Sequence, residues 1–148
     1  MSDEASSPAR VFSEAETRHL LGRELLRGTR YQDFLSLYLI RLASAGAPMA
    51  ALREAVAREI AEMLRFTDIV GTIDDDIVVI LVHTPSADAL VIGERIRERI
   101  ESTTFSLITP GRVTLRMALS CFPTDATAGG ALLAHAQTQL EAGPLTSP

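Results

Sequence analysis

Apolar residues recur along this chain with two different spacings, which predicts alternating helices and strands. Three- and four-residue spacing, as in Leu52, Val56 and Ile60, predicts amphipathic helices over 13–28, 49–65, 85–101 and 131–142. Short continuous apolar runs predict strands over 34–42, 68–73, 77–82 and 113–122. Ser13 is suited to cap the first helix, with Glu16 as its capping-box partner, and Gly28 is suited to end it.

The order of these elements, αβαββαβα, defines the expected fold class. A hairpin between two helices predicts an α/β (α+β) fold with a mixed, largely antiparallel central sheet flanked by helices. Residues 1–10 and 143–148 are rich in Ser, Pro or Gly, so we expect flexible ends on either side of one domain over 11–142.

Composition and charge narrow the possible functions. All 14 basic residues among the 148 are arginine, which excludes a Schiff-base lysine and the lysine of a P-loop, although codon bias in a GC-rich genome also explains this choice. The net charge of −5 argues against nucleic acid and anionic membranes as partners. A single cysteine, Cys121, and the absence of a visible secretory signal favour a cytoplasmic protein. The three histidines show no metal-ligand spacing.

Four long strings of the sequence resemble the GGDEF family of diguanylate cyclases, in particular the response-regulator type. They are ELLRGTRYQDFLSLYLI, LREAVAREIAEMLRFTDIVGTIDDDIVVIL, TPSADALVIGERIRERI and VTLRMALSCFPTD. The resemblance covers residues 11–142 and implies a GGDEF/nucleotidyl-cyclase-like fold.

The resemblance also implies that the catalytic signature is degenerate. The signature falls on Asp74, Asp75, Asp76, Ile77 and Val78, so aspartates replace both glycines and an isoleucine replaces the essential acid. Isoleucine can neither ligate Mg²⁺ nor move a proton. The stretch YLIRLAS lacks the family's metal-binding aspartate, the loop over 45–50 lacks its base-recognition residues, and its phosphate-binding lysine falls at Pro144. We therefore predict a pseudoenzyme with no cofactor and no metal.

A new metal site on the three aspartates is the competing interpretation of the hairpin tip. Adjacent residues in a tight turn point to opposite faces, so a solvated acidic turn is favoured. Aspartate also tolerates the positive φ angles that such turns need.

One family motif is retained in this sequence. The resemblance places an inhibitory-type Arg-x-x-Asp site for cyclic di-GMP on Arg65 and Asp68, five residues before the signature, with Arg95 on the next helix as a third participant. A guanidinium can bond guanine O6 and N7 or a phosphate, and a carboxylate can accept from guanine N1–H and N2–H. The alternative is an ordinary ion pair at a helix end.

These observations give two hypotheses of function. The first is a catalytically inactive effector that binds cyclic di-GMP through Arg65, Asp68 and Arg95 and signals to a protein partner that the sequence does not identify. A homodimer is possible, and Arg27, Arg30 and Tyr31 are candidates for a dimer contact or a second face of the ligand. The alternative is a nucleotide-independent protein–protein interaction module derived from a GGDEF domain. Residual cyclase activity is the least favoured reading.

Overall fold

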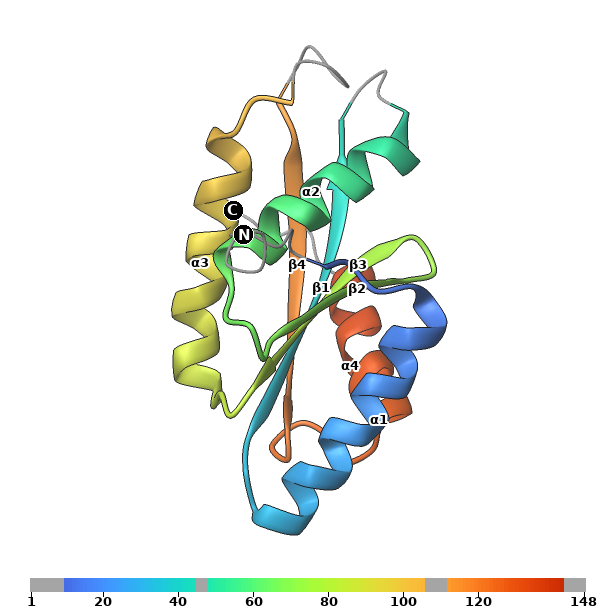
Figure 1. Cartoon of the computed structure of the whole chain (residues 1–148), viewed down its shortest axis with the longest axis vertical. Coiled ribbons are helices and arrows are strands. Elements are labelled where there is room, and N and C mark those ends of the chain that lie inside the picture. Colours follow the sequence, from blue (N-terminus) through green and yellow to red (C-terminus); the bar gives the residue numbers. More distant parts are fainter. Residues whose placement is uncertain (1–9, 45–47, 106–111, 143–148) are drawn as a thin grey trace, which may run out of the picture.

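The computed structural model describes residues 10–44, 48–105 and 112–142, and the elements in them follow the predicted order (Figure 1). These elements are α1 (Glu14–Tyr31), β1 (Leu35–Ala43), α2 (Met49–Met63), β2 (Ile69–Ile73), β3 (Asp76–Val82), α3 (Ser86–Ser102), β4 (Thr114–Phe122) and α4 (Gly129–Ala142). Residues 1–9 and 143–148 of the predicted flexible ends, including Pro144, and residues 45–47 of the loop over 45–50 lie outside the described residues.

The four strands form one sheet in the order β2-β3-β1-β4. The pairings β1–β3, β1–β4 and β2–β3 are all antiparallel, and a single isolated bridge between Phe12 and Gly71 is parallel. The predicted antiparallel character is therefore confirmed for the described sheet. Strand β1 lies between β3 and β4, and helices cover both of its faces. This position explains why β1 is an almost continuous apolar run.

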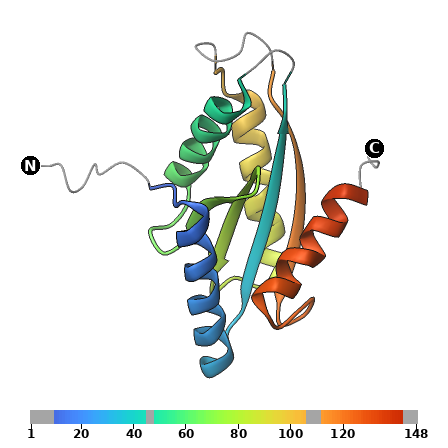
Figure 2. The same ribbon diagram turned by 90° about the vertical axis from the view of Figure 1, so that its right-hand side faces the viewer.

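Two helical layers cover the two faces of this sheet (Figure 2). The helices α1 and α4 pack on one face with Leu37 and Leu39 of β1, whereas α2 and α3 pack on the other face with Tyr38 and Ile40. Side chains that alternate along a strand leave opposite faces, so β1 contributes to both cores.

Several predicted element ends are wrong by a few residues, for identifiable reasons. The first helix continues past Gly28 to Tyr31, and Gln32 ends it in the left-handed conformation, with φ of 55°. Gly28 packs against Phe122, whose ring atom Cε2 would lie 2.9 Å from an added Cβ. The last helix begins at Gly129, two residues earlier than predicted. At the other end of the chain, the capping box between Ser13 and Glu16 is present and confirms the predicted start of α1.

Helix α3 is held against the sheet by one buried hydrogen bond. The Tyr38 hydroxyl donates to the Ala89 carbonyl at 2.8 Å, and a Cβ at Gly93 would collide with the same tyrosine. Burial raises the pKa of Tyr38 to about 12. The glycine thus lets the helix approach the ring closely. None of the described helices is both long enough and apolar enough to cross a membrane.

Candidate functional site

An arginine–aspartate pair joins the central strand to the signature hairpin. Arg41 of β1 donates from Nε to Asp76 Oδ1 at 2.8 Å and from its terminal NH₂ to Asp76 Oδ2 at 2.9 Å. Ile40 and Ile77 are partners across the antiparallel strands; Arg41 directly follows Ile40, and Asp76 directly precedes Ile77. The Asp76 side chain is 6% exposed, and its hydrogen bonds raise the pKa of Arg41.

The hairpin tip is therefore only partly the solvated acidic turn that the sequence predicts. Asp74 has a φ of 55°, as expected for an aspartate in such a turn, and its N–H donates to Glu14 at 2.9 Å. The Asp75 side chain is 92% exposed, with Arg53 at 4.0 Å. Asp76 corrects the prediction, because it is buried and belongs to β3. Cross-strand pairing with Arg41 places the Asp76 carboxylate between the central strands β1 and β3, at the end of the sheet next to the hairpin tip.

A cavity of about 410 Å³ opens at this end of the sheet, beside the hairpin tip, and acidic side chains outnumber basic ones in its lining. Its charged lining consists of two guanidiniums and four carboxylates, from Arg41, Arg53, Asp74, Asp75, Asp76 and Glu141. The site does not fit a divalent cation, since Arg41 already takes both oxygens of the one buried carboxylate. Within the described residues no group of three His, Cys, Asp or Glu side chains is arranged to hold a metal ion.

The second arginine–aspartate pair is the retained motif between α2 and β2. The helix ends at Met63 and the strand starts at Ile69, so Arg65 and Asp68 lie in the connecting turn and not at the helix end and strand start that the sequence predicts. Asp68 accepts both from the Arg65 backbone N–H at 3.2 Å and from its guanidinium at 2.9 and 3.1 Å. The Asp68 carboxylate thus accepts the Arg65 backbone N–H, which has no helical partner once the helix has ended.

Long-range contacts fix the same guanidinium. The terminal NH₂ of Arg65 donates to the Val82 carbonyl at 2.6 Å and to Thr84 Oγ1 at 3.0 Å. Asp68 also accepts from the Val82 N–H at 3.3 Å. The Asp68 side chain is 1% exposed, whereas the Arg65 side chain is 52% exposed. These hydrogen bonds hold the partly exposed cation in one orientation, and the bonds to Asp68 raise the pKa of Arg65.

The third predicted participant, Arg95, has a different environment. It is exposed on α3, and within the part of the chain that the structure describes it makes no side-chain hydrogen bond or ion pair. Arg65 is tied to the residues that lead into the start of this helix, because Thr84 lies two residues before Ser86. The Arg95 guanidinium therefore has no partner among the described residues, and it lies on the helix whose preceding residues, Val82 and Thr84, are bonded by Arg65.

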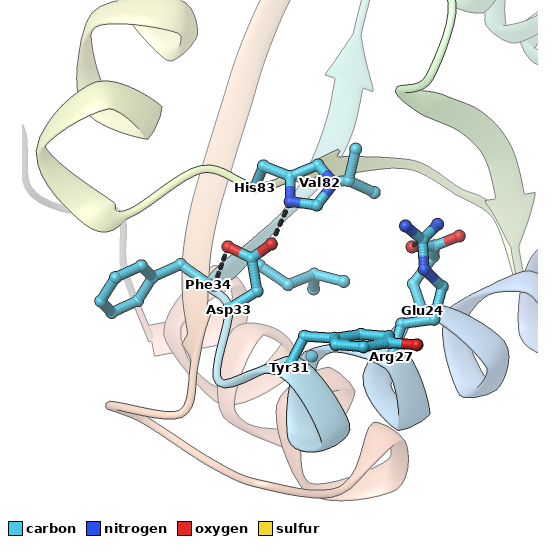
Figure 3. A pocket seen from close by; sticks show the side chains of 9 residues that line it. Glu24, Arg27, Tyr31, Asp33, Phe34, Val82 and His83 are labelled. Carbon is cyan, nitrogen blue, oxygen red and sulfur yellow. Dashed lines mark hydrogen bonds and ion pairs between the residues drawn. The ribbon is translucent and has the colours of Figure 1, made fainter.

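A small cavity of about 130 Å³ lies next to the Val82 anchor (Figure 3). Asp33 pairs with His83 on one side, and Glu24 pairs with Arg27 on the other at 3.4 Å, with Tyr31 between α1 and the opening. Its volume is well below the several hundred Å³ of a typical nucleotide-sized pocket.

Sequence reasoning missed Arg41, Val82 and Thr84. Arg41 stands in the stretch noted only for lacking an acid, yet pairing the two apolar runs in register would have set it opposite Asp76. Val82 and Thr84 act on Arg65 from 17 and 19 residues away, and only the hairpin geometry shows this.

Comparisons with known proteins agree with this fold. No family model matches the chain. No curated protein matches it either. Among solved structures, the GGDEF domain of YfiN from Pseudomonas aeruginosa is 20% identical, with a TM-score of 0.72 and 88% of each chain covered. The chain therefore has the GGDEF-domain fold of diguanylate cyclases, as the sequence predicts.

Two further neighbours are solved as complexes. The GGDEF domain of DgcB from Caulobacter crescentus, solved with c-di-GMP, is 12% identical with a TM-score of 0.71, over 92% of this chain and 84% of that one. The diguanylate cyclase SiaD from Pseudomonas aeruginosa, solved with its activator SiaC, is 17% identical with a TM-score of 0.70. That match covers 94% of this chain and 60% of SiaD.

Proposed function

We propose that this chain is a catalytically inactive GGDEF-fold domain that binds cyclic di-GMP on the surface carrying Arg65 and Arg95. One observation carries the proposal: the Arg65 guanidinium is held by Asp68, Val82 and Thr84, yet its side chain stays 52% exposed. A guanidinium that is already oriented loses little conformational entropy when it bonds a ligand.

Each of the three motif residues has a distinct role in this proposal. Arg65 offers its remaining N–H groups to guanine O6 and N7 or to a phosphate. Arg95 supplies a second cation, free of other partners among the described residues. Asp68 is a positioning residue, because its buried carboxylate is already used by Arg65 and Val82. DgcB, which shares the fold, is solved with c-di-GMP.

Inactivity is proposed from the other arginine–aspartate pair. Cyclase chemistry needs metal ions and cationic groups to neutralise a triphosphate. Next to the hairpin tip, Arg41 pairs with the buried carboxylate of Asp76, and acidic groups outnumber basic ones around the 410 Å³ cavity. Ile77, which the resemblance places at the essential acid, is fully buried in β3.

Calorimetric titration of the full chain with cyclic di-GMP tests the binding, with GTP as the control ligand. We expect binding that Arg95→Ala abolishes or weakens at least about tenfold, which corresponds to the loss of one charge-assisted contact. Arg95 has no partner among the described residues, so this variant should keep its thermal stability. Arg112→Ala, at an exposed arginine before β4, is the matched control. Absence of binding, or an Arg95→Ala variant that binds like wild type, contradicts the proposal.

Incubation of the pure protein with GTP and Mg²⁺ tests the proposed inactivity. We expect no cyclic di-GMP by chromatography. If cyclic di-GMP forms, and removal of Mg²⁺ abolishes its formation, the residues at the hairpin tip still support catalysis and the proposed inactivity is wrong.

A nucleotide-independent interaction module is the second candidate, and one observation favours it. The Asp68 side chain is 1% exposed and its oxygens already accept four N–H groups from Arg65 and Val82, as expected for a purely structural pair. SiaD, with the same fold, is solved with a protein activator. In this case Arg65→Ala lowers the melting temperature, and cyclic di-GMP gives no heat and no shift in melting temperature.

A further inference from the structure

The outward face of α1 combines unpaired positive charge with exposed apolar side chains. Arg23, Leu26 and Arg30 follow the i, i+3, i+7 spacing of one helix face. Tyr31 follows Arg30 at the end of the helix, on the side of Arg27 and the small cavity. Leu26 is 73% exposed and Tyr31 is 66% exposed. Arg23 and Arg30 make no ion pair or hydrogen bond with any described side chain. We name Arg23, Leu26, Arg30 and Tyr31 the basic face.

The outward face of α3 has the same construction with the opposite charge. Leu90, Glu94 and Glu98 follow helix-face spacing, with Val91 adjacent, and the cation Arg95 borders them at four residues after Val91 and three before Glu98. Leu90 is 58% exposed and Val91 is 53% exposed. The carboxylates of Glu94 and Glu98 have no partner among the described residues. We name Leu90, Val91, Glu94 and Glu98 the acidic face.

These two faces cannot meet within one molecule. Helix α1 lies on one side of the sheet and α3 on the other (Figures 1 and 2). The buried residues of the two helices belong to the cores on opposite faces of the sheet, so their exposed residues are turned away from each other. Four of the six large apolar side chains that are exposed among the described residues lie on these faces. Exposed apolar groups with flanking charges are typical of protein interfaces.

We propose that the basic face of one copy docks on the acidic face of a second copy of this chain. Charge complementarity selects this occupant, because Arg23 and Arg30 can pair with Glu94 and Glu98 around a contact between Leu26, Tyr31, Leu90 and Val91. Contact between two basic faces or two acidic faces would place like charges opposite each other. The same surface patch therefore cannot be used on both copies.

Such a contact is heterologous and has a consequence for assembly. Each contact uses one basic and one acidic face and leaves the other face of each copy free. Repetition of the contact produces a closed ring or an open chain of molecules, depending on the rotation between neighbours. The contact pairs neither Arg65 nor Arg95, although Arg95 lies beside Val91 and Glu98 on the same helix surface. Association is measured without any nucleotide, so its failure is distinguishable from failure of the proposed ligand site.

Sedimentation velocity and light scattering on the full chain, over a concentration series at low and high salt, measure the association. We expect the mass to rise above the 16.0 kDa of one chain as protein concentration increases at low salt. The rise should weaken in about 0.5 M salt, where charges on exposed side chains are screened. A mass that stays at one chain at every concentration overturns the proposal.

Charge reversal on each face tests which surfaces are used. In Arg23→Glu/Arg30→Glu both faces are acidic, and in Glu94→Arg/Glu98→Arg both are basic, so each variant alone should dissociate at least about tenfold more readily. An equal mixture should associate again, because each face then meets its opposite charge on the other variant. Arg58→Glu/Arg112→Glu makes the same change in net charge as Arg23→Glu/Arg30→Glu, away from both faces, and should associate like wild type. Variants that associate like wild type, or a mixture that stays dissociated, contradict the proposed contact.

Discussion

Two arginine–aspartate pairs of nearly identical local geometry occupy opposite ends of the hairpin and differ in what surrounds them. In both, the guanidinium donates two hydrogen bonds to a carboxylate that is at least nine-tenths buried, at 2.8 and 2.9 Å for Arg41–Asp76 and 3.1 and 2.9 Å for Arg65–Asp68. Arg41 joins two strands beside further carboxylates, whereas Arg65 joins a turn to the end of β3.

The surroundings decide what each guanidinium can do for a ligand. The hydrogen bonds to Asp76 are the main cause that raises the pKa of Arg41, and coulombic interaction with Asp76, Glu141 and Asp75 raises it further, so its charge is balanced from several sides. Asp68 is the charged partner of Arg65, and the remaining acceptors of that guanidinium are a carbonyl and a hydroxyl. The same kind of pair therefore supports two different proposals, an anion site blocked at Arg41 and a cation oriented for a ligand at Arg65.

Removal of Arg41 should have the largest effect on stability. Arg41→Ala leaves the Asp76 carboxylate buried without its partner, and we expect a loss of about 2 kcal/mol in the free energy of unfolding, less than for a fully buried pair because Arg41 is 38% exposed. Urea denaturation measures the loss. Arg41→Met/Asp76→Leu should recover most of it. Equal losses in the single and double variants would show that the pair itself is not the cause.

Asp68→Asn should have a smaller effect, because the shape of the side chain and part of its hydrogen bonding are retained. We expect about 1 kcal/mol, from the weakened bonds to the Arg65 guanidinium and the Val82 N–H. Calorimetry on the same variant sharpens the comparison: if Asp68 positions Arg65, the affinity for cyclic di-GMP falls in parallel. A loss of stability with unchanged affinity would restrict Asp68 to a structural role.

Glu14→Gln should weaken the tether between α1 and the hairpin tip, in a manner that depends on pH. The Asp74 N–H and the Arg18 side chain lower the pKa of Glu14 below its ordinary 4.5. A lowered pKa in the folded state means that the stabilisation is present above the unfolded value and is lost as pH falls through the folded value. Wild type should therefore melt higher than the variant at pH 7, and the difference should vanish in acid. A difference that is constant with pH would exclude the carboxylate charge as its cause.

Asp75→Asn should have the smallest effect of the four. Its side chain is 92% exposed and its nearest cation, Arg53, lies 4.0 Å away, so we expect a change below about 0.5 kcal/mol in the free energy of unfolding. A change as large as that of Arg41→Ala would show that the exposed end of the hairpin contributes as much as its buried pair.

Much of the fold could be predicted from local patterns in the sequence. Leu52, Val56 and Ile60 define a helix face over only nine residues, and the runs in β1 and β3 are mostly apolar, so element type and order follow from short-range spacing. Element ends depend on tertiary contacts. Gly28 resembles a helix terminator, yet it is a contact point for Phe122, 94 residues further along.

The candidate site was less predictable, because its geometry depends on pairs that are distant in sequence. Arg65 and Asp68 could be selected from their spacing, but the burial of Asp68 depends on Val82. Three consecutive aspartates predict a solvated turn that includes Asp76. The cross-strand arginine that binds its carboxylate is 35 residues away, so the local sequence does not indicate its burial. Local sequence identifies the residues of a site, whereas strand register decides which of them are exposed.

The contact between Tyr38 and Ala89 gives this protein an optical reporter of its own folding. The chain contains two tyrosines and no tryptophan, so near-ultraviolet absorbance and fluorescence arise mainly from Tyr31 and Tyr38. Tyr38 is 5% exposed, and burial raises its pKa to about 12, so the native protein keeps this phenol protonated at a pH where a solvent-exposed tyrosine ionises. Release of helix α3 would expose the ring and allow the phenolate to form. An alkaline absorbance change thus separates molecules with α3 docked from molecules in which it has detached.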